Sequence, residues 1–291
     1  APTLALGTGV ANGATAAEAT QGTGVVTISG ESGATISVTF SRTGGGSVTK
    51  TVTGSGSAQA VTLAAGDLTT LGDGSISVSA TQTDAAGNAQ TAAAATTSFT
   101  LDTFAPNAPS ITSVTDDIGI NQGVLTSGQS TDDSDLTVRV TLAGTTAVAG
   151  DAVAIYNGTT LLGSTTTLTG TNISSGFVDL QTGSLVTATT YNLTARVIDA
   201  AGNPSPYSTG FAVTYIAPVT FNATKNTDTF TGGAGDDRFI FTKADQVQSA
   251  DRFDGSAGID TIVISGDTGV AIDFTAGTSS FANIEAIRSE E

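Results

Sequence analysis

The sequence predicts an all-β protein with two tandem β-sandwiches and a C-terminal segment of short strand repeats. Three observations predict this fold class. Short stretches alternate apolar and polar residues, which is the pattern of a strand with one buried face. Turns of glycine and other small residues separate these stretches. A five-residue motif at 84–88 recurs at 199–203, which indicates that one module is repeated along the chain.

The composition suits strands rather than helices and is unusual for an enzyme. Gly, Thr, Ser, Ala and Val dominate, while aromatic residues make up 5% and charged residues 12% of the chain. A length of 291 residues predicts two or three domains. The hydrophobic share of 38% allows a core in each of them, so we do not interpret the chain as disordered.

Residues 1–105 are predicted to form the first sandwich. The alternation is clearest at 35–40 and 75–81, where every second residue is apolar. Glycine-rich turns such as 44–46 and 72–74 separate the strands. Several short strands at this spacing are typical of a sandwich. The predicted strands cover residues 25–30, 35–40, 47–52, 60–63, 75–81 and 97–101.

Residues 106–218 repeat the same plan and are predicted to form the second sandwich. The motif Asp-Ala-Ala-Gly-Asn follows an alternating strand in both copies. Both modules end at an Ala-Pro pair, Ala105-Pro106 and Ala217-Pro218. Because proline restricts the backbone at both joints, we expect a semi-rigid tandem array.

Residues 219–291 contain nonapeptide repeats with the pattern G-G-x-G-x-D-x-U-x. The stretch 232–240 fits every fixed position, and 223–231 and 255–263 are weaker copies. We expect the glycines, and Asn226 in their place, to adopt positive φ and turn carbonyl oxygens towards one point. The aspartate adds an anionic oxygen, and the large apolar residue, here Phe239, turns inward.

One such loop supplies only part of a calcium shell, because calcium takes about 6–8 oxygen ligands, so a stacked neighbour must supply the rest. The alternative is a glycine-rich turn with a solvated acidic flank, and Asp236 in particular is either a ligand or a solvated charge. The candidate calcium ligands of this segment are Asn226, Asp228, Gly232, Gly233, Gly235, Asp236, Asp237, Gly255, Gly258 and Asp260.

These nonapeptides and the stretch 281–287 resemble the RTX family of secreted calcium-binding proteins. The resemblance covers about residues 222–291. It implies a short parallel β-roll, bound calcium as the cofactor, and secretion by a type I route in which the chain folds outside the cell.

The two sandwiches resemble the bacterial immunoglobulin-like domains of giant surface adhesins. The matching features are the two Asp-Ala-Ala-Gly-Asn loops, the joint Asp102-Thr103-Phe104-Ala105-Pro106 and two paired acidic loops. The resemblance implies immunoglobulin-like folds with calcium at the joint. The second joint has Thr214 where the first has Asp102, which weakens the case for calcium there. The residues expected to gather at the first joint are Asp84, Asp102, Asp116, Asp117, Asp132 and Asp133.

Asp199 in the second Asp-Ala-Ala-Gly-Asn loop is a further candidate ligand. Crowded carboxylates without a cation would have raised pKa values and would lower stability. The alternative is that all these aspartates only start turns.

The charge and the missing residue types exclude several functions. The net charge of −17 argues against nucleic acid and against anionic membranes as partners. The chain has no His and no Cys, which excludes a Ser-His-Asp triad, a cysteine nucleophile and a His-based zinc site. No run of residues is apolar enough to predict a membrane span. Because the chain begins at Ala1 without methionine, we expect it to be a piece of a longer protein.

We therefore expect a non-enzymatic, extracellular, calcium-dependent structural protein of the bacterial cell surface, such as a surface-layer, filament or matrix subunit. Self-association or a tandem array would be its main interaction. One alternative is the stalk of a large RTX adhesin in attachment or biofilm, with a cell-surface glycan or lipopolysaccharide as partner. Another is a non-catalytic part of a secreted RTX enzyme.

Overall fold

Strands dominate the secondary structure, which confirms the predicted all-β class. The structure is a computed structural model, and it describes residues 1–119, 122–265 and 280–290. Part of the predicted C-terminal segment, 266–279 and 291, therefore lies outside the described residues. The chain divides into two units: unit 1 holds 1–107, 146–152 and 197–206, and unit 2 holds 108–145, 153–196 and 207–291.

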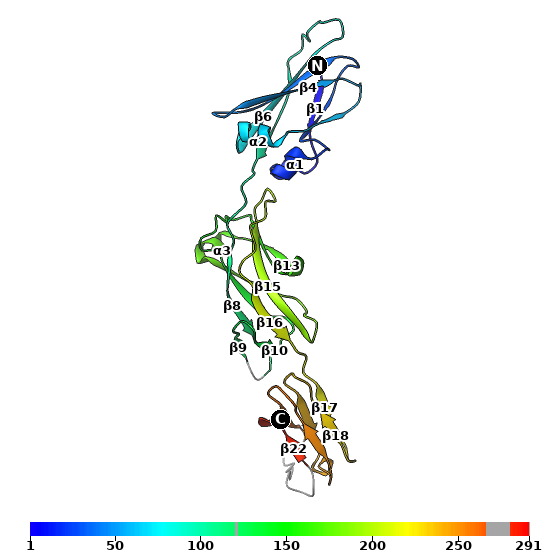
Figure 1. The fold of residues 1–291 in the computed structure, drawn as a ribbon, viewed down its shortest axis with the longest axis vertical. Coiled ribbons are helices and arrows are strands. Elements are labelled where there is room, and N and C mark those ends of the chain that lie inside the picture. Colours follow the sequence, from blue (N-terminus) through cyan, green and yellow to red (C-terminus); the bar gives the residue numbers. More distant parts are fainter. Residues whose placement is uncertain (120–121, 266–279, 291) are drawn as a thin grey trace. The chain divides into compact units, whose positions relative to one another are not determined.

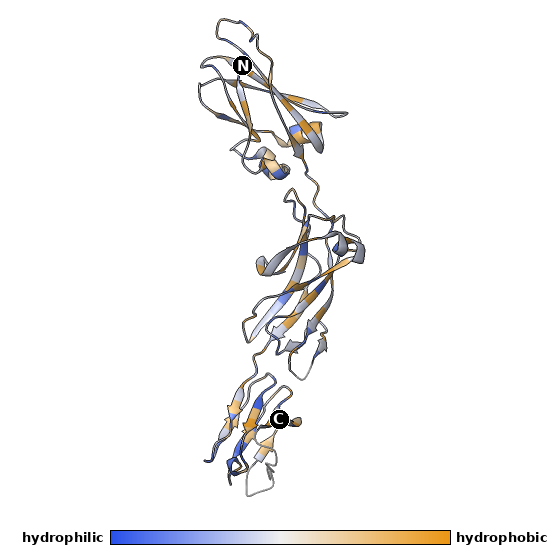
Figure 2. Ribbon diagram, turned by 180° about the vertical axis from the view of Figure 1, so that it is seen from behind, coloured by the Kyte–Doolittle hydropathy of each residue, from blue (hydrophilic) through white to orange (hydrophobic). Residues whose placement is uncertain are grey.

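The first sandwich consists of two antiparallel sheets in unit 1, with strand orders β1-β2-β5 and β4-β3-β6-β7 (Figure 1). Apolar and polar residues alternate along these strands (Figure 2), so that Ile36, Val38 and Phe40 lie fully buried between the sheets. All six predicted strands are confirmed, with ends shifted by a few residues. The strands are β1 (Thr3–Leu6), β2 (Val26–Ser29), β3 (Thr35–Arg42), β4 (Ser47–Thr53), β5 (Gln59–Val61), β6 (Gly74–Thr83) and β7 (Ala95–Leu101).

Short helices escaped prediction because three to seven residues are too few to show a helical period. Helix α1 begins with a capping box: the Glu18 amide donates to Thr15 Oγ1 at 3.2 Å, and Glu18 Oε2 accepts from the Thr15 amide at 2.9 Å. No helix in the described ranges has the length and apolarity needed to cross a membrane. The helices are η1 (Val10–Asn12), α1 (Ala16–Thr20), α2 (Ala65–Leu71), α3 (Gly170–Ser175) and η2 (Ala244–Gln246).

Residues 110–215 form the second pair of sheets, with strand orders β14-β11-β8-β9 and β10-β16-β15-β12-β13. All described pairings here are antiparallel except that of β10 with β16. The strands are β8 (Ser110–Asp116), β9 (Gly123–Val124), β10 (Ser130–Thr131), β11 (Thr137–Thr141), β12 (Ala152–Asn157), β13 (Thr160–Thr167), β14 (Phe177–Gln181), β15 (Thr189–Ile198) and β16 (Phe211–Tyr215).

Residues 220–265 and 280–290 form a β-roll, in which two parallel sheets face each other and successive strands alternate between them. The sheet orders are β17-β19-β21-β23 and β18-β20-β22, and every described pairing is parallel. The strands are β17 (Thr220–Asn222), β18 (Thr229–Thr231), β19 (Arg238–Phe241), β20 (Arg252–Asp254), β21 (Thr261–Ser265), β22 (Ser280–Ala282) and β23 (Ala286–Glu290).

Phenylalanine rings fill the space between the two sheets of the roll. The nine-residue spacing places Phe221, Phe230 and Phe239 on alternate sheets, with ring centroids 4.9 Å and 5.1 Å from Phe221. Phe253 then contacts Phe239 at 5.7 Å and stacks on Phe281 at 5.1 Å. The prediction that Phe239 turns inward is confirmed, because its side chain is fully buried.

Most glycines of the roll are needed for space rather than for positive φ, which corrects part of the prediction. Gly258 has the predicted positive φ, at 130°, but Gly232, Gly233, Gly235 and Gly255 do not, and neither does Asn226. A Cβ added at Gly232 or Gly255 would instead overlap a backbone carbonyl of the next coil and a loop carboxylate. Close stacking of one coil on the next therefore excludes a side chain at these positions.

We predict that Phe253→Ala destabilises the roll by about 3–5 kcal/mol, because it removes a buried ring that contacts both sheets. Hydrogen exchange followed by mass spectrometry should show faster exchange in β19, β20 and β21. Phe40→Ala, which removes a ring from the core of the first sandwich, is the matched control and should speed exchange in β3 and β6 instead. Equal loss of protection in both regions for either variant would contradict separate cores.

Candidate cation sites

A buried carboxylate stands two residues before the inward side chain of each of the strands β18, β19, β20 and β21. Asp237, Asp251 and Asp260 are fully buried, and Asp228 is 8% exposed. Asp237, Asp228 and Asp260 were predicted from the nonapeptide pattern. Asp251 was missed because it lies outside the repeat frame, although Asp251-Arg252-Phe253 has the same D-x-U form.

These carboxylates form two ladders that hold successive coils in register. In one ladder the Asp237 amide donates to Asp260 Oδ1, and the Asp260 amide donates to Glu285 Oε2, both at 2.8 Å. In the other ladder the Asp228 amide donates to Asp251 Oδ1 at 2.8 Å. Each ladder therefore stacks like charges in an interior with little water.

The second oxygen of most ladder carboxylates accepts a hydrogen bond from an amide of its own loop. Asp237 Oδ2 accepts from the Gly233 amide at 2.5 Å, and Asp228 Oδ2 accepts from the Thr224 amide at 2.6 Å. Both donors lie four residues before the aspartate. These bonds compensate for the water that the carboxylates lose on burial.

Asp260 lacks the corresponding bond. The residue four positions before it is Ser256, whose amide donates to Asp254 Oδ1 at 3.0 Å instead. Asp260 Oδ2 is consequently buried without a hydrogen-bond partner among the described residues. Burial, and then the charges of Asp237, Glu285 and Asp236, raise the pKa of Asp260 to about 6.

Two candidate oxygen ligands lie beside Gly255: a Cβ added there would overlap both Asp260 Oδ2 and the carbonyl oxygen of Asn283. Only oxygen ligands are present, which suits calcium or magnesium. Nowhere in the described ranges do three or more acidic side chains converge as metal ligands, so carbonyl oxygens would have to complete the shell.

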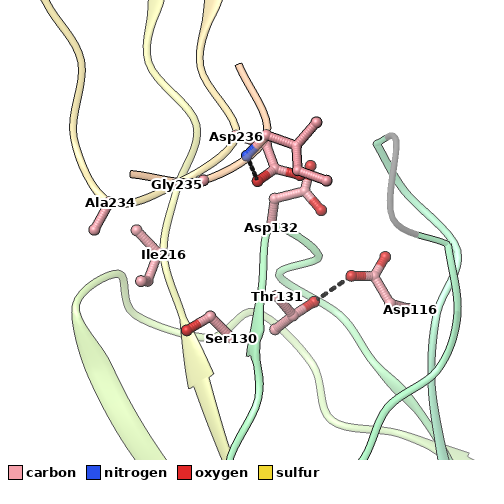
Figure 3. Close-up of a pocket in the computed structure, with 10 residues that line it drawn as sticks. Asp116, Ser130, Thr131, Asp132, Ile216, Ala234, Gly235 and Asp236 are labelled. Carbon is pink, nitrogen blue, oxygen red and sulfur yellow. Dashed lines mark hydrogen bonds between the residues drawn. The ribbon is translucent and has the colours of Figure 1, made fainter. Parts of the chain in front are cut away.

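A second acidic site lies in unit 2, in a pocket of about 330 Å³ lined by Asp116, Asp132 and Asp236 (Figure 3). Asp116 is buried, and its Oδ2 accepts from Thr131 Oγ1 at 2.6 Å. Asp236 Oδ1 accepts from the Ile259 amide at 2.8 Å. Burial, followed by the charges of Asp116 and Asp236, raises the pKa of Asp132 to about 6. Asp236 is thus more than a solvated loop charge.

The other two members of the paired acidic loops have different roles. Asp133 is buried, and its Oδ1 accepts from the Asp135 amide at 2.8 Å, so it shapes its own loop. Asp117 is exposed, and its amide donates to Asp133 Oδ2 at 3.4 Å. Neither side chain lines the pocket.

The expected gathering of aspartates at the first joint is wrong for Asp84, which does not meet Asp102 within unit 1. In unit 2, Asp116 at the end of β8 and Asp132 line one pocket with Asp236 of the roll. In the first sandwich Gly74 pairs with Leu101, so Asp84 and Asp102 follow opposite ends of the same sheet. Strand direction separates residues that the linear order had grouped.

Asp84 remains by itself at an exposed loop. Its Oδ2 accepts from Asn88 Nδ2 at 2.8 Å, and its Oδ1 accepts from the Asn88 and Ala86 amides at 2.8 Å and 2.9 Å. These bonds, with the Asn88 side chain first, hold the pKa of Asp84 below its usual value. Its geometry is that of a turn-forming aspartate.

Asp102 instead has three acidic neighbours within unit 1. Burial, followed by the charges of Asp199, Asp73 and Asp151, raises the pKa of Asp102. Asn203 Nδ2 donates both to the Asp102 carbonyl at 3.0 Å and to Asp199 Oδ2 at 2.9 Å, which fixes the Asp199 loop. The sequence analysis missed Asp73 and Asp151, because only the fold brings these turn residues beside Asp102.

We predict that, in a chelator, the protein loses stability relative to the Asp260→Asn variant as the pH rises from about 4 to about 6. Between the unfolded pKa of 3.8 and the raised folded pKa of about 6, the folded state retains a proton that the unfolded state has released. Deprotonation through this range therefore favours unfolding. Denaturant unfolding of both proteins at several pH values measures the difference.

Asp245→Asn is the matched control in the same roll. Lys225, whose Nζ lies 2.8 Å from the carboxylate, holds the pKa of Asp245 below its usual value. The protein should therefore gain stability relative to this variant as the pH rises through the acid range. The same sign for both variants would contradict the assignment of the unpaired charge to Asp260.

Comparison with known proteins finds weak similarity to bacterial adhesins. No protein-family model matches the sequence, and no curated protein matches it. A tetra-tandem repeat from the extending region of a large adhesion protein is 18% identical, with 73% of this chain and 48% of that chain covered and a TM-score of 0.27. A Ca²⁺-stabilized adhesin with which an Antarctic bacterium binds ice is 23% identical, with 79% and 51% covered and a TM-score of 0.35.

A third similar structure belongs to a 1.5-MDa bacterial ice-binding adhesin, at 20% identity with 70% of this chain and 65% of that chain covered and a TM-score of 0.29. The chain thus spans less than two thirds of each of these structures. All three come from adhesion proteins. Similarity at this level assigns no family, so the proposals below rest on the chain's own residues.

Proposed function

We propose that this chain is a calcium-dependent structural protein outside the bacterial cell, as a subunit of a surface layer, a filament or a matrix. The observation that carries the proposal is the buried, unpaired Oδ2 of Asp260 within a ladder of carboxylates. A buried charge without a partner costs several times more than an ordinary missing hydrogen bond. A bound calcium ion would remove this cost and attract the carbonyl oxygens beside it.

In this proposal calcium holds the coils of the roll together. Asp260, the carbonyl of Asn283 and the Gly255 loop would form the site, and the ion would supply positive charge between stacked carboxylates. The roll contains few repeats and a small aromatic core, so it depends on such a staple more than a large domain does. Without calcium, repulsion along the ladder should loosen the roll.

Two further groups of acidic residues, one in each unit, support the proposal that calcium also binds elsewhere in the chain. Asp116, Asp132 and Asp236 bring three carboxylates from two sheet systems of unit 2 into one pocket. In unit 1, burial and then the charges of Asp199, Asp73 and Asp151 raise the pKa of Asp102. An ion at either cluster would neutralise repulsion and stiffen the connection between successive sheets.

We propose an extracellular location because sites of this kind are expected to have low affinity for calcium. Extracellular calcium modules bind with Kd values of about 10⁻⁴–10⁻³ M, so they fill only where calcium is abundant. A roll that folds when it meets calcium also suits type I export, in which the chain crosses unfolded. This route is part of the proposal and derives from the RTX resemblance.

Self-association is the proposed interaction of the subunit. The net charge of −17 opposes contact between copies, and bound calcium would reduce it. Edge strands such as β4 and β13 end their sheets and offer unpaired backbone groups to a neighbour. The second candidate function is the stalk of an adhesin, which the two consecutive sandwiches and their Ala-Pro joints favour.

We predict that calcium at about 100 times its Kd stabilises the roll by about 2.7 kcal/mol for each site filled. Denaturant unfolding, monitored by hydrogen exchange in β19 and β21, measures this gain with and without calcium. Asp260→Asn should lose the gain of one site, whereas the surface variant Asp245→Asn should retain it. An equal gain in both variants would place calcium elsewhere.

We further predict that the protein associates when calcium is supplied and disperses when it is chelated. Light scattering during a calcium titration measures association, and magnesium at equal ionic strength is the control for simple charge screening. Association with calcium alone supports the structural subunit. A chain that stays monomeric at saturating calcium would favour the adhesin stalk.

A further inference from the structure

The outward face of the β4-β3-β6-β7 sheet carries only hydroxyl side chains. The strand registers align these residues in rows across the four strands, for example Thr49–Thr39–Ser79–Thr96 and Ser47–Ser41–Ser77–Ser98. None of the residues is buried. We call this surface the hydroxyl face, and its members are Thr35, Ser37, Thr39, Ser41, Ser47, Thr49, Thr51, Thr53, Ser75, Ser77, Ser79, Thr81, Thr83, Thr96, Ser98 and Thr100.

Strand propensity alone does not account for the hydroxyl face. Threonine is favoured in strands, but serine is not. Serine nevertheless occupies every position of one row across the four strands. An ordinary solvent-facing sheet also includes charged residues. The corresponding sheet of the second sandwich does: Arg139 pairs with Asp179 at 2.7 Å and lies 4.0 Å above the Phe177 ring.

Most hydroxyls of this face are available to a ligand. Thr39 and Thr49 bond to each other at 3.1 Å, and Ser47 donates to the Phe40 carbonyl at 3.2 Å. No other member makes a side-chain hydrogen bond within the described residues. A shallow hollow of about 520 Å³ also opens on this face, lined by Ser41, Ser77, Ser79, Thr96 and Ser98 among others.

Charge selects the kind of partner. The face has no charged member, whereas the chain as a whole carries −17. Anionic polymers, including nucleic acids and acidic glycans, are repelled by that charge and find no cation on this face. A neutral partner is not repelled. Because it carries no charge, it loses little hydration energy on binding and needs no opposite charge on the protein.

Geometry selects the chemistry of that partner. Neighbouring strands lie about 4.8 Å apart, and members of one strand lie about 6.7 Å apart, so the hydroxyls form a regular lattice. Each hydroxyl both donates and accepts a hydrogen bond. A polymer with regularly repeated hydroxyls can match many positions at once, and many weak contacts then add up to useful avidity.

We propose that the hydroxyl face binds the surface of a neutral polysaccharide through hydroxyl-to-hydroxyl hydrogen bonds. The face has no aromatic residue for stacking on a single sugar ring, so the ligand is an extended polymer surface rather than a monosaccharide. The site lies within unit 1 and uses no carboxylate. Its failure would therefore leave the calcium proposal unaffected.

The test uses the full chain at saturating calcium with insoluble cellulose, amylose and chitin as neutral probes. Carboxymethyl-cellulose, which has the cellulose backbone with added negative charge, is the matched control. We expect retention on at least one neutral polymer and none on the charged one. Absence of retention on all three neutral polymers, or equal retention on carboxymethyl-cellulose, would overturn the proposal.

The double variant Thr39→Glu with Ser79→Lys replaces a cross-strand hydroxyl pair at the centre of the face with an ion pair. It preserves net charge and copies the Arg139–Asp179 arrangement that the second sandwich already tolerates. Retention should fall about tenfold or more, since two hydroxyl contacts are lost and two charges must lose water. Thr190→Glu with Thr214→Lys, at an exposed threonine pair elsewhere, should leave retention unchanged.

Thr51→Val with Thr81→Val keeps the branched shape while removing two hydroxyls of one row that make no side-chain hydrogen bond among the described residues, so it guards against misfolding of the charged variant. Retention should fall for this variant too, with an unchanged circular dichroism spectrum. Equal retention by both variants and by the control would overturn the proposal. If the variants instead abolish an oligomer and leave retention unchanged, the face is a contact between copies and the proposal is wrong.

Discussion

The β-roll depends on carboxylates that have left water and must be neutralised by backbone amides or by a cation. Each buried aspartate stands two residues before an inward side chain, so the same turn that starts a strand also buries a charge. Amides from the loop and from the neighbouring coil compensate for most of these oxygens. Asp260 Oδ2 is the exception, because the Ser256 amide donates to Asp254 instead. One diverted hydrogen bond thereby creates the strongest candidate cation site.

The close stacking of the coils follows from the same ladders. A carboxylate that bonds the next coil draws the two loops together, and Gly232 and Gly255 leave room for the carbonyls and carboxylates that approach them. The phenylalanine rings pack between the two sheets of the roll. The ladder carboxylates, the glycines beside them and the phenylalanine rings therefore depend on one another for this close packing.

The sandwiches place their charges differently from the roll. Most of their acidic residues lie in loops at the ends of strands, and the hydroxyl face carries no charge at all. Asp102 with Asp199 in unit 1, and Asp132 with Asp236 in unit 2, show carboxylates that meet across loops from distant parts of the sequence. The strongly negative chain thus keeps one broad sheet surface neutral.

Much of this fold could be predicted from the sequence, because strand alternation and the nine-residue spacing of Phe221, Phe230 and Phe239 are local patterns. The burial of Asp228, Asp237 and Asp260 beside an inward residue has the same local origin. Tertiary structure alone decided which aspartates meet. Strand pairing places Asp84 and Asp102 at opposite ends of one sheet, and the fold brings Asp73 and Asp151 to Asp102 instead. Such meetings depend on pairings between distant strands, and no short stretch of sequence records them.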